Sequence, residues 1–272
     1  MAIETYSFTQ LSHYLGCPLR YKYRYLEGWR EKPIRASLHF GRAFEAALQA
    51  LFLRKDPVVR FYEEWQPVRE LPIEYSSGES WDSMARHAEW LLGRFVQDDR
   101  VRIRQPQQNL QVKLVRHLPE LNKDFVAYID AIGLLKGRRS VIEWKTSASR
   151  YPDKPPRLLV LDPQLVCYSW LTGIEHVGLV VFVRKKQPEI QYLQVRIGVE
   201  RRARFGELVV SAIQQTESGQ FLPHSGIRFP RNGCVSCAYL GLCLDNEALI
   251  SRRLVRLNPA EQGSDWLDEL EV

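Results

Sequence analysis

The sequence predicts an α/β fold in which a mixed central β-sheet is flanked by helices. Apolar residues recur at helical spacing in the amino-terminal part of the chain, for example along Ser37–Leu51. From Leu110 the pattern changes to short runs rich in β-branched and aromatic residues, which indicate strands. A helical segment carrying Gln164 and Tyr168 separates two of these runs, and a strand–helix–strand crossover joins parallel strands. The sheet is therefore expected to contain both parallel and antiparallel pairs.

Three helices are predicted in the amino-terminal region. Ser7-Phe8-Thr9-Gln10 offers a hydroxyl cap for a first helix. That helix is expected to end near Cys17-Pro18, because proline disfavours helix in the residue before it. The second helix begins near Ser37 and continues through Leu51, with Glu45 at the border of its apolar stripe. A loop rich in Pro, Ser and Gly leads to the third helix, Trp81–Val96.

Five strands and a further helix are predicted in the rest of the chain. The polar turn Lys136–Arg139 contains a glycine and separates two β-rich runs, so these runs are expected to form a hairpin. The expected strands are Leu110–Leu118, Phe125–Leu135, Val141–Thr146, Val177–Arg184 and Ile190–Ile197, and the expected helix is Glu200–Thr216.

The composition is that of an ordinary soluble globular protein. The 272 residues are 45% hydrophobic and 26% charged, which fits one large domain or a domain with an accessory lobe. No apolar run is long enough to span a bilayer, and the longest, Val177–Val183, is predicted to be a buried strand. The amino terminus has no basic segment followed by an apolar one, so we expect a cytoplasmic protein. In that compartment the five cysteines are expected to be thiols or metal ligands.

Two acids and a lysine in the predicted hairpin form the strongest chemical signal. Asp130 lies in the first run, and Glu143-Trp144-Lys145 lies in the second. Because side chains alternate along a strand, Glu143 and Lys145 share one face and Trp144 takes the other. Burying two carboxylates together is costly unless a divalent cation neutralises them, and oxygen ligands suit Mg²⁺ or Mn²⁺. The alternative is an ion-pair cluster on a sheet edge, which the neighbouring isoleucines and valine disfavour.

Four of the cysteines have the spacing of a metal site. Cys234-x-x-Cys237 is followed by Cys243, and Cys17 is separated from them by 216 residues. Four thiolates suit either Zn²⁺ or a 4Fe–4S cluster, and the spacing alone does not choose between them. Such a site would join the two ends of the chain, so we expect a structural role. Cys167 is expected to be a packing residue.

Together these motifs resemble those of the PD-(D/E)XK nuclease superfamily. The carboxylates Asp130 and Glu143 with Lys145 resemble its core motif. Gly41-Arg42-Ala43-Phe44-Glu45 resembles the helix motif Gly-x-x-x-His of RecB-like nucleases, and Gln164–Tyr168 is similar to their Gln-x-x-x-Tyr motif. The four cysteines resemble those of the iron–sulfur branch, which includes AddB-type proteins and CRISPR-adaptation exonucleases. The resemblance therefore favours a 4Fe–4S cluster over Zn²⁺.

The resemblance implies a restriction-endonuclease-like core and assigns roles to the site residues. Asp130 and Glu143 would bind Mg²⁺ or Mn²⁺ together with Glu45 and the backbone carbonyl of Trp144. Lys145 would position or activate the attacking water. Gln164 and Tyr168 would hold a DNA phosphate or the lysine. Position 45 departs from the family pattern, which most often has His there, although a carboxylate also suits a hard cation.

Charge is distributed unevenly along the chain. The net charge is +6, whereas residues 260–272 contain five acids and no base. Arg20, Lys22 and Arg24 alternate with tyrosines, and such a segment could contact phosphates and stack on bases. The alternative is a helix that solvates its charges and packs its tyrosines on the core. The acidic tail is expected either to be solvated or to act as a docking peptide or a competitor of DNA.

These features predict a metal-dependent DNA nuclease, specifically an exonuclease on single-stranded or frayed ends in repair, recombination or CRISPR adaptation. No helicase phosphate-binding loop is present, so a helicase or other repair or CRISPR protein would be a partner chain. Two alternatives are a DNA-binding scaffold with little or no catalysis and a zinc-bound RNA-binding module. The expected organisation is a helical region (1–100), a nuclease core (101–220), an iron–sulfur lobe (221–259) and an acidic tail (260–272).

Overall fold

The chain divides into two compact units, each built from segments that are discontinuous in the sequence. The computed structural model describes residues 4–155, 157–223 and 233–257. Unit 1 comprises Met1–Lys32, Val115–Ala127 and Gly206–Val272, and unit 2 comprises Pro33–Leu114 and Tyr128–Phe205. The domain bounds expected from the sequence stay a prediction. The acidic tail lies outside the described residues.

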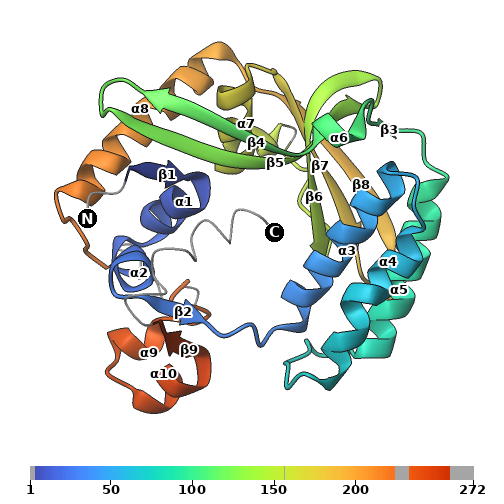
Figure 1. The fold of residues 1–272 in the computed structure, drawn as a ribbon, viewed down its shortest axis with the longest axis horizontal. Coiled ribbons are helices and arrows are strands. Elements are labelled where there is room, and N and C mark those ends of the chain that lie inside the picture. The colour runs from blue at the N-terminus through green and yellow to red at the C-terminus, as the bar shows by residue number, and fades with distance from the viewer. Residues whose placement is uncertain (1–3, 156, 224–232, 258–272) are drawn as a thin grey trace. The chain divides into compact units, whose positions relative to one another are not determined.

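Unit 2 contains the mixed sheet that the sequence predicts (Figure 1). Antiparallel pairing joins β5 to β6 and β7 to β8, whereas β6 and β7 pair directly in parallel and are connected through the helix α7 (Pro163–Thr172). The strands are β3 (Val101–Arg102), β4 (Leu110–Leu118), β5 (Lys123–Leu135), β6 (Arg138–Ser147), β7 (His176–Val183) and β8 (Glu189–Arg196), of which β4 and β5 extend into unit 1.

The hairpin between β5 and β6 closes through a two-residue turn. Lys136 and Gly137 both have left-handed backbone angles, with φ of 49° and 78°. This pair of angles matches the twist of the flanking strands, and glycine adopts it without steric cost. Lys136 also donates a hydrogen bond from Nζ to the carbonyl of Tyr192 at 2.8 Å. The turn fixes the register in which Ala131 pairs with Ile142.

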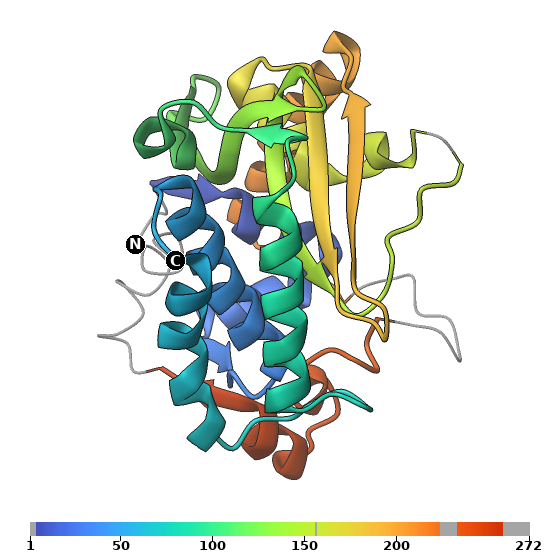
Figure 2. The same ribbon diagram turned by 90° about the vertical axis from the view of Figure 1, so that its right-hand side faces the viewer.

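Helices cover the sheet of unit 2. Figures 1 and 2 show α3, α4 and α5 lying together beside the strands β6, β7 and β8. The helices and helical turns of this unit are α3 (Ala36–Phe52), α4 (Pro57–Trp65), η2 (Gln66–Glu70), α5 (Trp81–Val96), α6 (Pro106–Asn109), η3 (Leu158–Leu161) and α7 (Pro163–Thr172). The sequence predicts α3, α5 and α7. It does not predict α4, although Asp56 caps that helix by accepting from the backbone N–H of Val58 and Val59.

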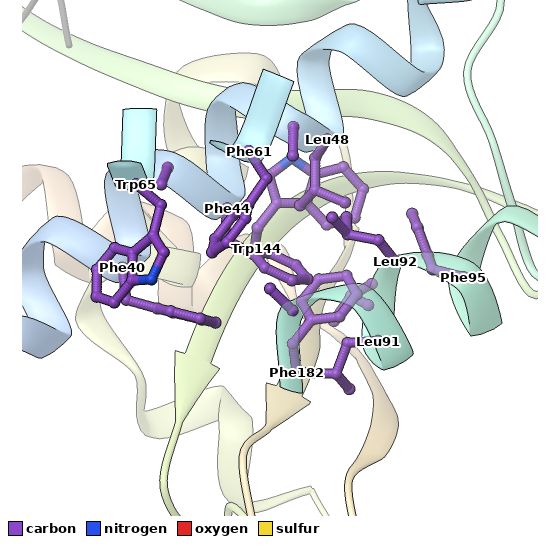
Figure 3. Packing of buried hydrophobic residues seen from close by; sticks show 14 of the residues in the cluster. Phe40, Phe44, Leu48, Phe61, Trp65, Leu91, Leu92, Phe95, Trp144 and Phe182 are labelled. Atoms are coloured by element: carbon purple, nitrogen blue, oxygen red, sulfur yellow. The ribbon is translucent and has the colours of Figure 1, made fainter. Parts of the chain in front are cut away.

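Aromatic side chains form the core between these helices and the sheet (Figure 3). The rings of Phe44 and Phe182 lie 4.6 Å apart, and Phe95 contacts Phe182 edge-on at 5.2 Å. Trp144 stacks on Phe52 at 5.9 Å. The alternation along β6 therefore directs Trp144 into this core and leaves Glu143 and Lys145 on the other side of the strand, as predicted.

Unit 1 is built around short elements from both ends of the chain. The strand β1 (Thr5–Ser7) runs parallel to the start of β5, and β2 (Trp29–Glu31) pairs antiparallel with β9 (Leu254–Arg256). A small core of Ala238, Tyr239 and Leu254 lies beside β2 and β9. The helices are α1 (Phe8–Gly16), α2 (Pro18–Tyr21), the π-helical turn η1 (Lys22–Leu26), α9 (Leu240–Cys243) and α10 (Glu247–Arg253), while α8 (Val199–Glu217) begins in unit 2 and continues into unit 1.

The first helix begins and ends where the sequence predicts. The Ser7 hydroxyl accepts from the backbone N–H of Gln10, whose side chain accepts from the backbone N–H of Ser7. Cys17 is extended and ends the helix directly before Pro18. Over the described residues, no helix combines the length and the apolar character needed to cross a membrane.

Candidate active site

Three carboxylates of unit 2 come together, one from each of three elements. Asp130 precedes Ala131 on β5, and Glu143 follows Ile142 on β6, so the register places the two acids beside each other. Glu45 reaches them from α3. Glu143 is only 4% exposed. The convergence of Glu45, Asp130 and Glu143 that the sequence predicts is therefore present.

Burial and mutual repulsion make this group of acids costly in its charged form. Burial, followed by the charges of Glu143 and Glu45, raises the pKa of Asp130 well above its usual value. Burial and the charge of Glu143 likewise raise the pKa of Glu45. The backbone N–H of Trp144 donates to Asp130 Oδ2 at 2.7 Å and partly offsets this cost. A cation among the three acids would offset the rest.

Lys145 is held between the acids and the helix α7. Its Nζ donates to Glu143 Oε1 and to Gln164 Oε1, the latter at 3.0 Å. Burial acts to lower the pKa of Lys145, but the charge and hydrogen bond of Glu143 outweigh it and leave the pKa above its usual value. The side chain is therefore an ammonium near neutral pH in this structure, which can donate hydrogen bonds and stabilise negative charge.

Gln164 links this lysine to Tyr168. The Gln164 amide accepts from Lys145 through Oε1 and donates from Nε2 to the Tyr168 hydroxyl at 2.7 Å. Asp162 caps α7 by accepting from the backbone N–H of Gln164 at 2.9 Å, which fixes the start of the helix. Burial, then the charges of Glu143 and Asp130, raise the pKa of Tyr168, so its phenol stays neutral. Of the two predicted contacts of Gln164, the one to the lysine is formed here.

Two glutamines outside the predicted set of site residues hold Glu45. Gln111 Nε2 donates to Glu45 Oε1 at 2.5 Å, and the side chain of Gln49 forms a second hydrogen bond. Gln49 lies one helical turn after Glu45, so its proximity was readable from the sequence. Gln111 is on β4 with φ of 48°, a left-handed conformation that few residues other than glycine adopt. No sequence pattern indicates that conformation.

The acids provide suitable ligands for a hard cation but do not form a closed ligand shell. Among the described residues, no group of three or more His, Cys, Asp or Glu side chains is arranged to hold a metal ion. Lys145, Gln111 and the Trp144 N–H occupy some of the carboxylate oxygens. Glu143 Oε2 is buried and has no hydrogen-bond partner within the described part of the chain. Oxygen donors with an uncompensated charge fit Mg²⁺ or Mn²⁺ once these contacts rearrange.

The four predicted ligand cysteines lie near one another in unit 1. Burial raises the pKa of the Cys243 thiol, and nearby Cys17 and Cys234 raise it further. Burial, followed by Cys17 and Cys243 among others, acts in the same way on Cys237. All four are free thiols, and none belongs to a preformed metal group in the residues that the structure describes. Cys167 is separate from them, fully buried in α7.

In the basic segment of unit 1, one tyrosine is buried and two basic side chains have partners within the unit. Tyr21 is buried, as expected for a tyrosine that packs on the core. Lys22 forms an ion pair with Glu27 at 3.2 Å, and Arg24 donates to the Tyr239 hydroxyl at 3.4 Å. Nucleic-acid binding by Arg20, Lys22 and Arg24 stays a prediction.

Comparisons with known proteins define the family. A sequence model of the PD-(D/E)XK nuclease superfamily matches residues 5–244, and the chain belongs to this superfamily. The match includes every residue of the carboxylate site and all four clustered cysteines. Membership of this superfamily supports a nuclease activity for the chain, and nucleases of this superfamily typically use divalent metals.

Two solved structures are similar to this chain, and the first of them shares its fold. A candidate exonuclease from Eubacterium rectale has a TM-score of 0.54 and 13% sequence identity, over 86% of this chain and 87% of its own. The structure of SSO0001 has a TM-score of 0.41 and 18% identity, over 90% of this chain and 88% of its own. No curated protein matches the sequence.

Proposed function

We propose that this chain is a Mg²⁺- or Mn²⁺-dependent DNA nuclease, specifically an exonuclease acting on single-stranded or frayed ends. The observation that carries the proposal is the convergence of Glu45, Asp130 and Glu143 beside Lys145 in unit 2. Membership of a nuclease superfamily supports the reaction class.

The chemistry of the site suits phosphodiester hydrolysis. A divalent cation bound by the three acids would polarise a phosphate oxygen and lower the pKa of a bound water. Without such neutralisation, buried carboxylates repel a phosphate. The Lys145 ammonium would then be free to stabilise the negative charge that develops on the phosphate in the transition state. Gln164 and Tyr168 hold that ammonium in one position, which favours a preorganised site.

We further propose that the chain belongs to the RecB-like iron–sulfur branch, and the four cysteines support this proposal. Cys17, Cys234, Cys237 and Cys243 would bind a 4Fe–4S cluster with a structural role, Zn²⁺ being the alternative ligand of four thiolates. A cluster would add its binding free energy to the stability of unit 1 and tie Cys17 to the distant carboxy-terminal segment. Anaerobic purification checks this assignment, because an iron–sulfur protein is brown and a zinc protein is colourless.

A DNA-binding scaffold is the alternative function. The replacement of His by Glu45 and the contacts that occupy the carboxylates favour it. The nuclease and the scaffold would both act in repair, recombination or CRISPR adaptation in the cytoplasm, with a helicase or related protein as a separate chain. They differ in whether the protein cleaves DNA.

The deciding experiment incubates labelled single- and double-stranded DNA, and RNA of the same sequence, with protein and Mg²⁺ or Mn²⁺. We expect cleavage that Asp130→Ala and Lys145→Ala both abolish. Asp124→Ala and Lys185→Ala are matched controls, because they remove exposed charges from β5 and from the loop after β7. Cleavage that survives both site substitutions would refute the proposal. Tight binding without cleavage under either metal would favour the scaffold.

A further inference from the structure

Three arginines of unit 1 gather around one histidine and one tyrosine. The rings of His13 and Tyr25 have centroids 5.7 Å apart. Arg24 and Arg30 both lie over the Tyr25 ring, with Cζ at 5.5 and 6.0 Å from its centre. Burial and the charges of Arg20, Arg24 and Arg30 lower the pKa of His13 to about 3, which places all three guanidinium groups close to it. We call Arg20, Arg24 and Arg30 the arginine cluster.

Two buried nitrogen atoms beside Tyr25 and the arginine cluster have no hydrogen-bond partner among the described residues. His13 Nδ1 and Arg20 Nε are both buried and have no hydrogen-bond partner among the described residues. Leaving a buried polar group unpaired is costly, and the cost is larger for a charged one. Arg20 forms no ion pair with any described residue that would satisfy this nitrogen. An anionic acceptor at the cluster would supply the missing partner.

The local backbone is built to hold these side chains. Arg24 and Tyr25 lie on η1, a π-helical turn, and such turns are frequent at functional sites. Gly16 ends α1 directly beside Arg20, where a Cβ would lie only 2.8 Å from a terminal guanidinium nitrogen. Glycine at position 16 therefore leaves room for the Arg20 head group. Arg30 is only 8% exposed, and one of its guanidinium nitrogens, Nη1, donates to the backbone carbonyls of Arg24 and Trp29, which fixes the position of this head group.

Lys22 provides a contrast on the same turn. It is paired with Glu27 at 3.2 Å, and its side chain is 43% exposed. An exposed lysine that already has a partner adds little to a specific anion site. Guanidinium groups present several donors in a planar fork that matches a phosphate, and they are more weakly hydrated than an ammonium. Burial and charge therefore favour the three arginines as ligands of a phosphate, whereas the exposed and already paired Lys22 is disfavoured.

We infer that the arginine cluster binds a backbone phosphate of the DNA strand, at a site in unit 1 that is distinct from the carboxylate site of unit 2. This inference rests on the proposed function only in taking DNA as the substrate. Arg30, which the sequence pattern did not indicate, belongs to the site, and Lys22 does not. Inorganic pyrophosphate shares the recognised chemistry and would compete for the same donors.

The test is DNA binding by the full-length protein in EDTA, where cleavage does not interfere. Fluorescence anisotropy measures the affinity for a labelled single strand at several salt concentrations. Arg20→Gln is expected to weaken binding about tenfold, or about 1.4 kcal/mol, and to reduce the salt slope by about 0.7. Lys22→Gln removes the same charge from the neighbouring segment and is expected to change affinity less than twofold. Pyrophosphate should displace DNA from the wild type more readily than from Arg20→Gln.

Gly16→Ala is a second variant that keeps every charge. It displaces the Arg20 head group, and alanine is tolerated at a helix end, so it should weaken binding without unfolding the protein. Thermal melting and the metal content of the purified protein monitor the fold. If Arg20→Gln lost that metal, Arg20 would act on Cys237, which its charge also reaches, and the inference would fail.

The outcomes separate this inference from the proposed nuclease activity. With active protein, Arg20→Gln should raise KM for DNA and leave kcat unchanged, whereas Lys145→Ala abolishes kcat. Equal losses in Arg20→Gln and Lys22→Gln would indicate diffuse electrostatic attraction and overturn the arginine site alone. A wild type that binds no DNA would overturn both the site and the choice of substrate.

Discussion

Replacing Asp130 by Asn should stabilise the metal-free protein while it abolishes metal binding. Asn has the shape of Asp and can still accept from the Trp144 N–H that now donates to Oδ2. The substitution removes the repulsion of Asp130 by Glu143 and by Glu45, together with its attraction to Lys145. The net change is therefore about one like-charge repulsion plus the cost of burying a carboxylate.

The size of the effect follows from Coulomb's law. Two unit charges about 6 Å apart at an effective dielectric constant of about 20 repel by about 3 kcal/mol. After relaxation we expect Asp130→Asn to raise the free energy of unfolding in EDTA by about 2 kcal/mol. In Mg²⁺ the order should reverse, because a ligand at one hundred times its Kd stabilises the wild type by about 2.7 kcal/mol and the variant much less.

Urea unfolding in EDTA and in saturating Mg²⁺ measures both quantities. Asp124→Asn is the matched control, since Asp124 lies on the same strand with a half-exposed side chain paired with His117. That control should change stability by no more than about 0.5 kcal/mol in either buffer. A destabilised Asp130→Asn protein in EDTA that retains the full Mg²⁺ effect would refute the electrostatic account of the site.

Three further predictions concern other parts of the molecule. Gln111→Gly removes the amide that holds Glu45, so it should weaken activation by Mg²⁺ several-fold in a metal titration. Because glycine adopts the left-handed backbone angle of 48° without strain, thermal melting should show no loss of stability. Hydrogen bonds from Arg100, and one from Tyr192, hold the pKa of Asp98 at about 2, below its usual 3.8. The stability due to Asp98, about 2 kcal/mol, is present above pH 4 and should disappear as the pH falls towards 2, whereas Asp98→Asn should lack this component of the acid transition. Cys17→Ser should lose the bound metal, solubility and DNA binding together, and a stable, active variant without metal would contradict the structural role of the cluster.

The central hairpin was predictable because local rules determine it. Alternating side chains and a glycine-containing turn placed β5 and β6, and the register then brought Asp130 beside Glu143. The expected strands differ from the observed ones by a few residues at their ends, where pairing with neighbouring strands extends them. Local structure was enough to predict that Asp130 and Glu143 are neighbours, whereas Glu45 was predicted from the resemblance of Gly41–Glu45 to a family motif.

Interactions that depend on distant segments or unusual backbone geometry were not predictable. The pairing of β2 with β9 joins residues more than 200 positions apart. The ion pair between Lys22 and Glu27 depends on the π-helical turn, since five residues separate neighbours in that geometry rather than three or four. The contact from Gln111 to Glu45 depends on a left-handed residue that no pattern signals.

Glu45 adds a third carboxylate to the site, and this added negative charge affects the metal that the site is expected to bind. A neutral imidazole at this position would add no charge, whereas the Glu45 carboxylate raises the pKa of Asp130 by repulsion. The amides of Gln49 and Gln111 favour the charged form of Glu45 and so offset part of the burial and repulsion that raise its pKa. We expect a site arranged in this way to bind a doubly charged hard cation more strongly than a site with imidazole would, and to bind softer metals less well, because its ligands are all oxygen. We therefore expect Glu45 to change the metal preference of an active nuclease, and metal binding that is absent under every divalent cation would instead favour the scaffold.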